Sequence, residues 1–278
     1  MAPGALNRPP RRGGSHSHSR GRGDGGQTAG DSVLVEGRRP VLEALRSGRE
    51  IHKILVADGL SRSSVVSEIL DAARARAIPV EHHPRSYFDA RAATPVHQGI
   101  MALASAYVYA TLKELLAIPM VTGQAPFFLV LDGITDPHNF GALLRSAEAA
   151  GVHGVIAQSR RSAPLGPTVA KASAGAVEHL PVASVVNLCR ALEEIKAAGV
   201  WAVGLDASAP NDLFSFELAD EPVAIVVGSE GAGLSRLVRE ACEVVVRIPM
   251  AGKVSSLNAS VAGALALFEV RRRRSAAR

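Results

Sequence analysis

The spacing of apolar residues divides the chain near residue 126. Beyond that point, near-continuous apolar runs alternate with stretches of helical periodicity. Such runs are typical of strands buried on both faces of a parallel sheet, and the alternation predicts an α/β domain with helices on both faces. The predicted strands are FFLVLD (127–132), HGVIAQ (153–158), WAVGLD (201–206), VAIVVG (223–228) and VVVRIP (244–249), with helices over about 139–150, over 187–198 and near Leu234. A ligand site is expected where the strands end.

Residues 31–106 carry a shorter alternating pattern that predicts a small α/β domain. Strands are expected at 51–57, 78–83 and 97–105, and apolar stripes predict helices around residues 41–45 and 65–73, with a short one near Tyr87. The segment holds no nucleophile, paired acid and base, or metal motif, so it is interpreted as a binding module. Six polar residues of this segment could contact a ligand, or could simply be exposed to solvent. They are Arg38, Arg39, Lys53, Arg85, His97 and Gln98.

Three segments fall outside these two domains. Residues 1–30 have almost no large apolar side chains and are predicted to be a disordered basic tail. Residues 107–125 contain Pro119 and Gly123 and are predicted to be a linker with a helical turn at 112–116. The second domain is expected to span residues 126–272, and 273–278 are predicted to be a second basic tail. The arginines at both ends are either solvated or in contact with phosphate.

Composition narrows the class of protein. With 278 residues, 47% hydrophobic, the chain suits two domains or one large one, and its net charge of +5 favours a polyanionic partner. Aromatic residues are only 4%, which argues against an extensive stacking platform for single-stranded nucleic acid. The two cysteines form no paired motif and the nine histidines show no ligand spacing, so no metal is expected. Neither a membrane span nor a signal peptide is recognisable, and a cytoplasmic location is predicted.

The stretch from residue 248 to 269, IPMAGKVSSLNASVAGALALFE, combines a turn with an unusual helix. Leu257, Val261, Leu265 and Phe268 recur at helical spacing, which predicts a core-facing stripe. Alanines and a glycine cover another face, so the helix can approach a neighbouring element closely. Ser256 and Asn258 fall where the helix begins and either cap it or face a ligand.

Two earlier loops carry further candidates. The segment after the first buried strand, LDGITDPHNFGALLRSAEAAG, places Asp132 and Asn139 near a helix start and Arg145 about two turns along it. An arginine on an apolar helix requires an anion, which is either Glu148 or a phosphate. The loop VVGSEGAGLS (226–235) has glycines that let backbone amides approach a ligand, with Glu230 among them. It matches neither the dinucleotide nor the Walker pattern, and a tight turn alone also explains its glycines.

Taken in order, DGITDPHNFGA with Arg145, then GSEG, then IPMxGxVxSLNxSVA closely resemble the SpoU family of the SPOUT methyltransferases. The resemblance covers residues 129–269. The segments GRRPVLEAL and HQGIMALAS are also similar to the ribosomal-protein-like substrate-binding domain that many of these enzymes carry.

The resemblance implies transfer of a methyl group from S-adenosylmethionine to a ribose 2′-hydroxyl in RNA, by a homodimer whose catalytic domain ends in a trefoil knot. The two-domain layout is most similar to enzymes that methylate a guanosine of 23S rRNA. Resistance-type rRNA methyltransferases share that layout, whereas members acting on tRNA often lack the N-terminal unit. The alternative from a different functional class is a non-catalytic RNA-binding or ribosome-assembly protein of the same fold.

Carried over by position, the resemblance implies catalytic roles for Arg145, Asn139, Glu230, Ser256 and Asn258. Arg145 is expected to act on the ribose hydroxyl and its adjacent phosphate, with the other four orienting Arg145, the ribose and the loops. The cofactor-binding positions implied are Gly228, Ile248 and Leu257, through their backbone, together with Ser229 and Met250.

Overall fold

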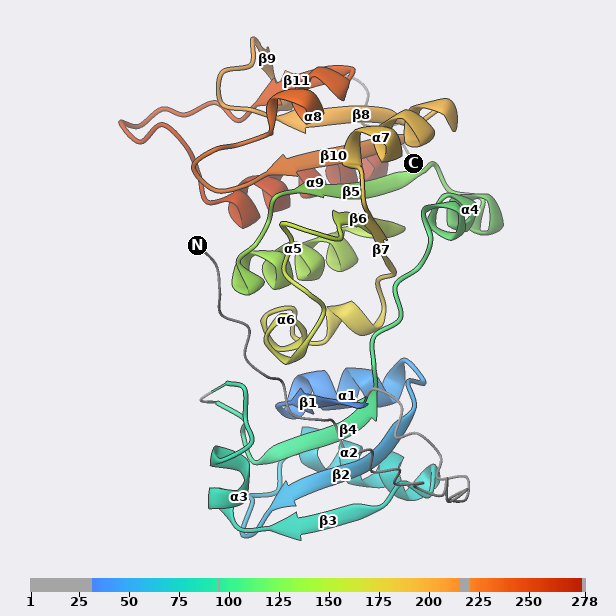
Figure 1. Ribbon diagram of the computed structural model, residues 1–278, viewed down its shortest axis with the longest axis vertical. Coiled ribbons are helices and arrows are strands. Elements are labelled where there is room, and N and C mark those ends of the chain that lie inside the picture. The colour runs from blue at the N-terminus through green and yellow to red at the C-terminus, as the bar shows by residue number, and fades with distance from the viewer. Residues whose placement is uncertain (1–31, 95, 216–220, 277–278) are drawn as a thin grey trace, which may run out of the picture. The chain divides into compact units, whose positions relative to one another are not determined.

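The computed structural model describes residues 32–94, 96–215 and 221–276 (Figure 1). The predicted tail at 1–30 and the last two residues, including Arg278, lie outside these ranges. Residues 31–278 form one compact unit that contains two sheets. No helix of the described residues is long and apolar enough to cross a membrane.

The N-terminal sheet is mixed, with strand order β1-β4-β2-β3. Strand β4 is antiparallel to both β1 and β2, and β2 is parallel to β3. One face packs on α1 and α2, while Phe88 of α3 packs on the other with Leu55 and Met101. The elements are β1 (Ser32–Glu36), α1 (Arg38–Arg46), β2 (Ile51–Ala57), α2 (Ser64–Ala75), β3 (Val80–His83), α3 (Arg85–Asp89) and β4 (Ile100–Ser105). All were expected except β1.

The C-terminal sheet has seven strands in the order β7-β6-β5-β10-β8-β11-β9, and every pairing is parallel. This confirms the predicted parallel α/β architecture. The strands are β5 (Phe127–Asp132), β6 (Gly154–Gln158), β7 (Val182–Val185), β8 (Trp201–Leu205), β9 (Asn211–Asp212), β10 (Val223–Gly228) and β11 (Val244–Arg247). Strands β7 and β9 were not expected, because they are short and lie at the edges of the sheet, where no long apolar run is needed.

Helices cover both faces of this sheet (Figure 1). Phe127, Leu129 and Leu131 of β5 point to the face that α5, α6 and α9 cover, and Phe128 and Val130 point to the face of α4, α7 and α8. Because both faces of the sheet are covered, side chains that alternate between them are all buried, and β5 is therefore apolar at every position from 127 to 131. The helical elements are α4 (Leu112–Thr122), α5 (Pro137–Ala150), α6 (Pro167–Ala172), η1 (Ala176–Glu178), α7 (Leu188–Ala197), η2 (Leu213–Ser215), α8 (Arg236–Ala241) and α9 (Ala259–Ala276).

Helix α4 occupies most of the predicted linker, so the expectation of a single helical turn was wrong. Thr111 and Glu114 form a capping box at its start, and Gly123 ends it in the left-handed region. Leu115 is fully buried, and its side chain fills the space beside Gly154. The segment is therefore part of the catalytic domain's packing.

Helix α9 packs through the small residues Ala259, Gly263 and Ala266, as its sequence predicts, and also through Leu267 and Val270. A Cβ on Gly263 would lie 2.4 Å from Cδ2 of Leu143 in α5, so any larger residue there would require the Leu143 side chain to move. The apolar stripe, however, is not core: Val261, Leu265 and Phe268 are 47%, 40% and 48% exposed. The expectation that this stripe faces the interior was wrong, because the close approach on the small face turns the large side chains outward.

The C-terminal arginines also differ from the predicted solvated tail. Helix α9 continues to Ala276, so the boundary expected at 272 falls within it. Arg274 donates to the carbonyls of Ala125, Pro126 and Glu221 and lies over the Phe127 ring. These carbonyls lie beside the starts of β5 and β10, so Arg274 ties the end of the chain to the sheet.

Candidate active site

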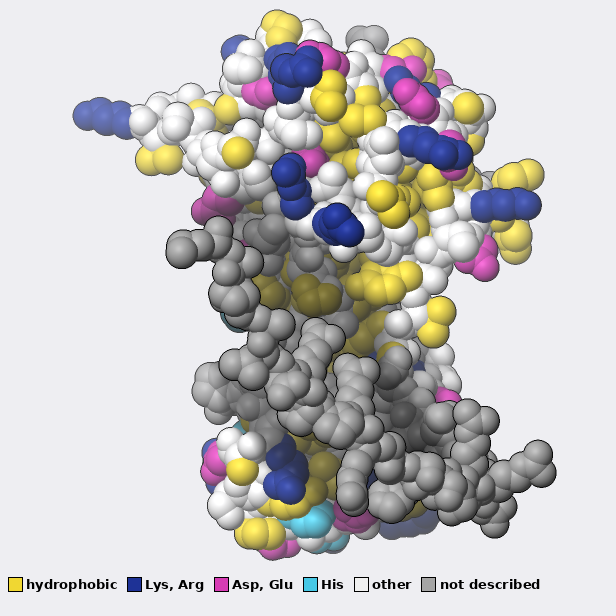
Figure 2. All heavy atoms as spheres, viewed as in Figure 1, with side chains coloured by type: hydrophobic (Ala, Val, Ile, Leu, Met, Phe, Trp, Pro, Cys, Tyr) yellow, Lys and Arg dark blue, Asp and Glu magenta, His cyan; other side chains and the backbone are white. Residues whose placement is uncertain are grey.

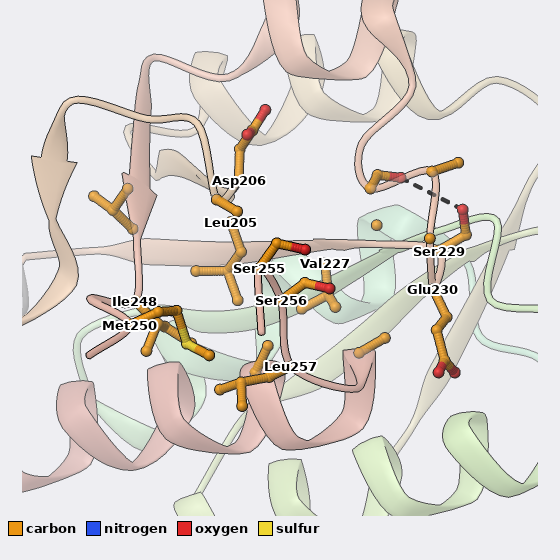
Figure 3. Close-up of a pocket in the computed structure, with 18 residues that line it drawn as sticks. Leu205, Asp206, Val227, Ser229, Glu230, Ile248, Met250, Ser255, Ser256 and Leu257 are labelled. Atoms are coloured by element: carbon orange, nitrogen blue, oxygen red, sulfur yellow. Dashed lines mark hydrogen bonds between the residues drawn. The ribbon is translucent and has the colours of Figure 1, made fainter. Parts of the chain in front are cut away.

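A pocket of about 250 Å³ opens at the carboxyl ends of β8, β10 and β11 (Figure 3). In a parallel sheet these ends share one edge, so the loops that follow them meet although they are far apart in sequence. The walls are Leu205–Ala207, Val227–Gly233, Val246, Ile248, Met250, Ser255–Leu257, Ala259 and Ala262.

All five residues expected to bind a cofactor line this pocket. They are Gly228, Ser229, Ile248, Met250 and Leu257. Sequence reasoning missed the contribution of the loop after β8, where Leu205, Asp206 and Ala207 form one wall, and it missed Ser255. A signal was present, since WAVGLD ends in an aspartate at the carboxyl end of a predicted parallel strand.

The loop after β10 folds back tightly on itself. The amide of Ser229 donates to the carbonyl of Gly233 at 3.0 Å, and the amide of Gly233 donates to the carbonyl of Ser229 at 2.9 Å. A Cβ on Gly228 would lie 2.1 Å from the carbonyl carbon of Gly233. Glycine at 228 is therefore a steric requirement of this turn, which places bare backbone along the pocket wall.

Three polar residues predicted to be catalytic form one hydrogen-bonded cluster. Nδ2 of Asn139 donates to Oε2 of Glu230 at 3.0 Å, and Nδ2 of Asn258 donates to the same oxygen at 3.1 Å and to Oδ1 of Asn139 at 3.0 Å. Figure 3 shows the Glu230 side chain pointing away from the Ser229 side chain, on the side of α5. The cluster thus joins the loops after β5, β10 and β11 at the edge of the pocket.

The cluster is held rigid by the helices that begin there. Oδ1 of Asn258 accepts from the amide of Ser260 at 2.9 Å, so this residue caps α9 while its Nδ2 reaches across the site. Asp136 caps α5 by accepting from the amides of His138 and Asn139 at 3.2 and 3.0 Å. Of the two alternatives that the sequence left open for Asn258, the structure shows capping, and a ligand contact of this side chain stays a prediction.

The other two residues predicted to be catalytic, Ser256 and Arg145, are not part of this hydrogen-bonded cluster. Ser256 is on the pocket wall, and its side chain is exposed. Arg145 lies six residues beyond Asn139 on α5, about 9 Å along the helix axis, and does not line this pocket. It is exposed and forms no hydrogen bond or salt bridge with the described residues, so the predicted alternative of an ion pair with Glu148 was wrong. It lines a separate hollow with Arg39.

Asp206 is one of two carboxylates that line the pocket, together with Glu230. A hydrogen bond from the Ser208 hydroxyl, at 2.7 Å, and one from Arg239, also at 2.7 Å, hold the pKa of the Asp206 carboxyl below its usual range. It is therefore ionised throughout the neutral range. The thiols are not part of the site, and burial raises the pKa of Cys242 to about 12. Within the ranges that the structure describes, no group of His, Cys, Asp and Glu is arranged to hold a metal ion.

Most residues of the N-terminal domain that were predicted to contact a ligand instead bond to other residues of the same domain. Arg38 donates to the Gln98 carbonyl and the Ser63 hydroxyl, while its own amide donates to the Gln98 side chain. Lys53 pairs with Glu81 at 3.0 Å. His97 is buried, bonded to Asp89 through Nε2 and to the Gly99 amide through Nδ1. Arg39 and Arg85 remain exposed, with no bond to the described residues.

Comparison with known proteins gives two family matches. Residues 126–268 match the model of the SpoU rRNA methylase family, and residues 34–110 match that of the RNA 2′-O ribose methyltransferase substrate-binding domain. A putative TrmH family tRNA/rRNA methyltransferase, YacO of Bacillus subtilis, is 44% identical over 240 residues, 86% of this chain and 95% of that protein. A relative with the same description from Staphylococcus aureus is 46% identical over 88% of this chain and 97% of its own.

Two solved structures are similar to this chain over most of both lengths. The SpoU methyltransferase AviRb of Streptomyces viridochromogenes, in complex with AdoMet, is 27% identical and has a TM-score of 0.73, covering 88% of this chain and 91% of its own. An AdoMet-bound rRNA methyltransferase from Sinorhizobium meliloti is 26% identical with a TM-score of 0.72 and covers 87% of both chains.

Proposed function

The chain belongs to the SpoU rRNA methylase family, and from this premise we propose that it methylates a ribose 2′-hydroxyl of RNA with S-adenosylmethionine as methyl donor. The observation that carries the proposal is the pocket at the carboxyl ends of β8, β10 and β11, with the Asn139–Glu230–Asn258 cluster at its edge. A substrate-binding domain matched at 34–110 supports RNA as the methyl acceptor.

The pocket suits such a donor in shape and in chemistry. Its lining combines apolar side chains and bare backbone with the carboxylates of Asp206 and Glu230 and with three serines, and specific sites commonly combine apolar walls with a few polar groups. Leu205, Ile248 and Leu257 offer apolar surface to an adenine, and the turn at Gly228 offers backbone groups. When bound there, S-adenosylmethionine supplies an electrophilic methyl group on a positively charged sulfur.

The chain's own residues then have to place a weak nucleophile. A ribose hydroxyl reacts only when it is held in line with the methyl group and its proton can leave. The free guanidinium of Arg145 is suited to hold the phosphate beside that hydroxyl, since its donors are not used within the described residues. Asn139, Glu230, Ser256 and Asn258 orient the ribose and the loops around it.

The proposed enzyme is a homodimer, and the exposed stripe of α9 supports this. Val261, Leu265 and Phe268 form an apolar groove with Ala142 and Ser146 of α5. Large exposed apolar side chains grouped in this way are typical of protein interfaces.

Within this function, a guanosine of 23S rRNA is the proposed target, on the similarity of the two-domain layout. The S. meliloti structure is described as an rRNA methyltransferase, whereas the curated relatives are named tRNA/rRNA methyltransferases, so tRNA is the alternative substrate. A C-terminal trefoil knot and a cytoplasmic location also stay predictions. A non-catalytic RNA-binding protein would have no use for the donor pocket.

The first prediction tests Arg145 directly. Arg145→Ala is expected to lower kcat for methyl transfer from labelled S-adenosylmethionine to rRNA by about 100-fold or more, since it removes a charged donor from the reacting group. Calorimetry should show unchanged affinity for S-adenosylmethionine, because Arg145 does not line the donor pocket. Arg190→Ala is the matched control, since Arg190 is exposed and paired with Glu194. Wild-type turnover by Arg145→Ala would remove this residue from the mechanism.

The substrate and the class of protein need their own measurements. Wild-type protein is offered protein-free rRNA and tRNA, and the methylated riboses are mapped. Transfer to 23S rRNA supports the proposed target, and transfer to tRNA alone replaces it with the alternative. Absence of both donor binding and methyl transfer would favour the non-catalytic protein.

A further inference from the structure

A second hollow, of about 510 Å³, lies outside the donor pocket and is lined by residues of both matched domains. Arg39 and Glu43 of α1 contribute from the N-terminal domain. The catalytic domain contributes Arg145, Glu148, Ser173, Ala174, Ala176 and His179. Arg145, the residue proposed to act on the ribose, therefore faces the same space as an arginine of the substrate-binding domain.

Two arginines, two glutamates and a histidine line this hollow, and they differ in whether they have partners within the protein. Neither Arg39 nor Arg145 forms a hydrogen bond or salt bridge with the described residues, and both are exposed. The Glu43 carboxylate is already used, since it accepts from Arg46 at 2.9 Å and lies 2.9 Å from Nε2 of His179. Glu148, the other acidic residue that lines the hollow, forms no hydrogen bond or salt bridge with the described residues. Two free guanidinium groups facing one space favour an anionic ligand there.

The position of Arg39 is fixed by buried contacts between α1 and the catalytic domain. Arg49 pairs with Glu178 at 2.8 Å, with side chains only 9% and 3% exposed, and Tyr107 donates to the same carboxylate at 2.9 Å. A Cβ on Gly175 would lie 2.7 Å from Cβ of Glu43, so the backbone there packs directly on α1. Arg39, on the exposed side of α1, is held at the hollow by this packing.

We infer that Arg39 is a second phosphate-binding residue of the RNA site: the hollow takes the sugar–phosphate backbone beside the target ribose, gripped by Arg39 from one side and Arg145 from the other. The inference rests on the proposed function, because it takes RNA as the ligand. It gives the N-terminal domain a direct contact next to the reacting nucleotide, in addition to any recognition of RNA further away.

The test measures binding of protein-free 23S rRNA by filter binding over a range of salt concentrations. Arg39→Ala is expected to raise the Kd by about three- to tenfold and to reduce the slope of log K against log salt by about one, as loss of one phosphate contact does. Arg74→Ala is the control, since it removes the same charge from an exposed residue of the same domain that already pairs with Asp71. Its Kd and slope are expected to equal those of the wild type.

A charge change of opposite sign sharpens the test. Glu148→Gln removes the unpaired negative charge from the hollow and is expected to lower the Kd for rRNA by about twofold. Glu193→Gln is the control, because Glu193 is an exposed residue of α7 outside the hollow, and it is expected to leave the Kd unchanged. Arg39→Ala with the Kd and salt slope of Arg74→Ala would overturn the inference, whatever the catalytic result. Wild-type protein that binds rRNA but transfers no methyl group would instead sink the proposed function, and the two failures are thus separate.

Discussion

At the scale of single residues, the site depends on side chains that do two things at once. Asn258 caps α9 with its oxygen and bonds Asn139 and Glu230 with its nitrogen. Glu230 accepts both amides through one oxygen, so its other oxygen is left for a further donor. Such shared bonding restricts rotamers and fixes the geometry before any substrate arrives.

Glu269 provides a residue-scale prediction on stability. This buried carboxylate accepts from Arg272 at 2.8 and 2.9 Å and from Arg273 at 2.7 Å, and these bonds, led by that from Arg272, lower its pKa to about 2. Because the folded pKa lies below the unfolded one, the stabilisation is present above about pH 4.3 and is lost as pH falls toward 2. Glu269→Gln should therefore be less stable than wild type by about 1 to 2 kcal/mol at pH 7.

Urea unfolding at pH 7, 5, 4 and 3 measures this difference. The gap between wild type and Glu269→Gln is expected to shrink steadily below pH 5. Glu240→Gln, which breaks an exposed pair with Arg236, is the control and should show little gap at any pH. A gap for Glu269→Gln that does not change with pH would contradict the assigned pKa.

At the scale of elements, the donor pocket is a consequence of parallel pairing. Strands β5, β10 and β8 lie side by side in register, so Asp132 and Gly228 are direct neighbours at their carboxyl ends. Each following loop then starts from a fixed point at the same edge. The turn after β10 adds a steric constraint, because Gly228 touches the backbone of Gly233.

Substitution of this glycine gives the element-scale prediction. In Gly228→Ala the added methyl group has to displace backbone, and we expect affinity for S-adenosylmethionine to fall at least about tenfold with the fold retained. Calorimetric titration measures the affinity, and circular dichroism checks the fold. Gly252→Ala is the matched control, because a Cβ there meets nothing within 4 Å. Equal affinity in the two variants would show that the turn does not shape the donor site.

At the scale of the whole molecule, the groove between α5 and α9 leaves large apolar side chains exposed to solvent in a single chain. On the face of the molecule that Figure 2 shows, apolar side chains lie among charged ones. Val261, Leu265 and Phe268 are grouped on one helix instead, and burial of such residues supplies much of the free energy of obligate dimers.

Leu265→Glu is the prediction at this scale. The wild-type protein is expected to sediment as a dimer at micromolar concentration, and Leu265→Glu as a monomer, since the new charge would be buried at the interface. Leu237→Glu is the control, because Leu237 is 57% exposed on α8, away from the groove, and should leave the dimer intact. A monomeric wild type would refute the proposed assembly.

The sequence by itself determined the parallel sheet and the loops that line the pocket. Apolar runs such as FFLVLD require burial on both faces, and parallel pairing then gathers the strand ends without any knowledge of contacts. Parallel pairing predicted only that these loops meet at one edge, whereas the resemblance to the SpoU family implied Gly228, Ile248 and Leu257 as cofactor-binding positions; all three line one pocket. The short edge strands and α4 escaped prediction because their patterns are weak, and tertiary packing supplies their order.

Only the tertiary structure decided which surfaces face each other. Periodicity shows that Val261, Leu265 and Phe268 share a helix face, but the contact of Gly263 with Leu143 determines that this face points outward. Likewise, nothing local in the sequence relates Arg39 to Arg145; the buried Arg49–Glu178 pair and the close approach at Gly175 bring them to one hollow. The physical reason is that a local pattern sets which side chains a segment presents, whereas long-range packing selects the partner that each one meets.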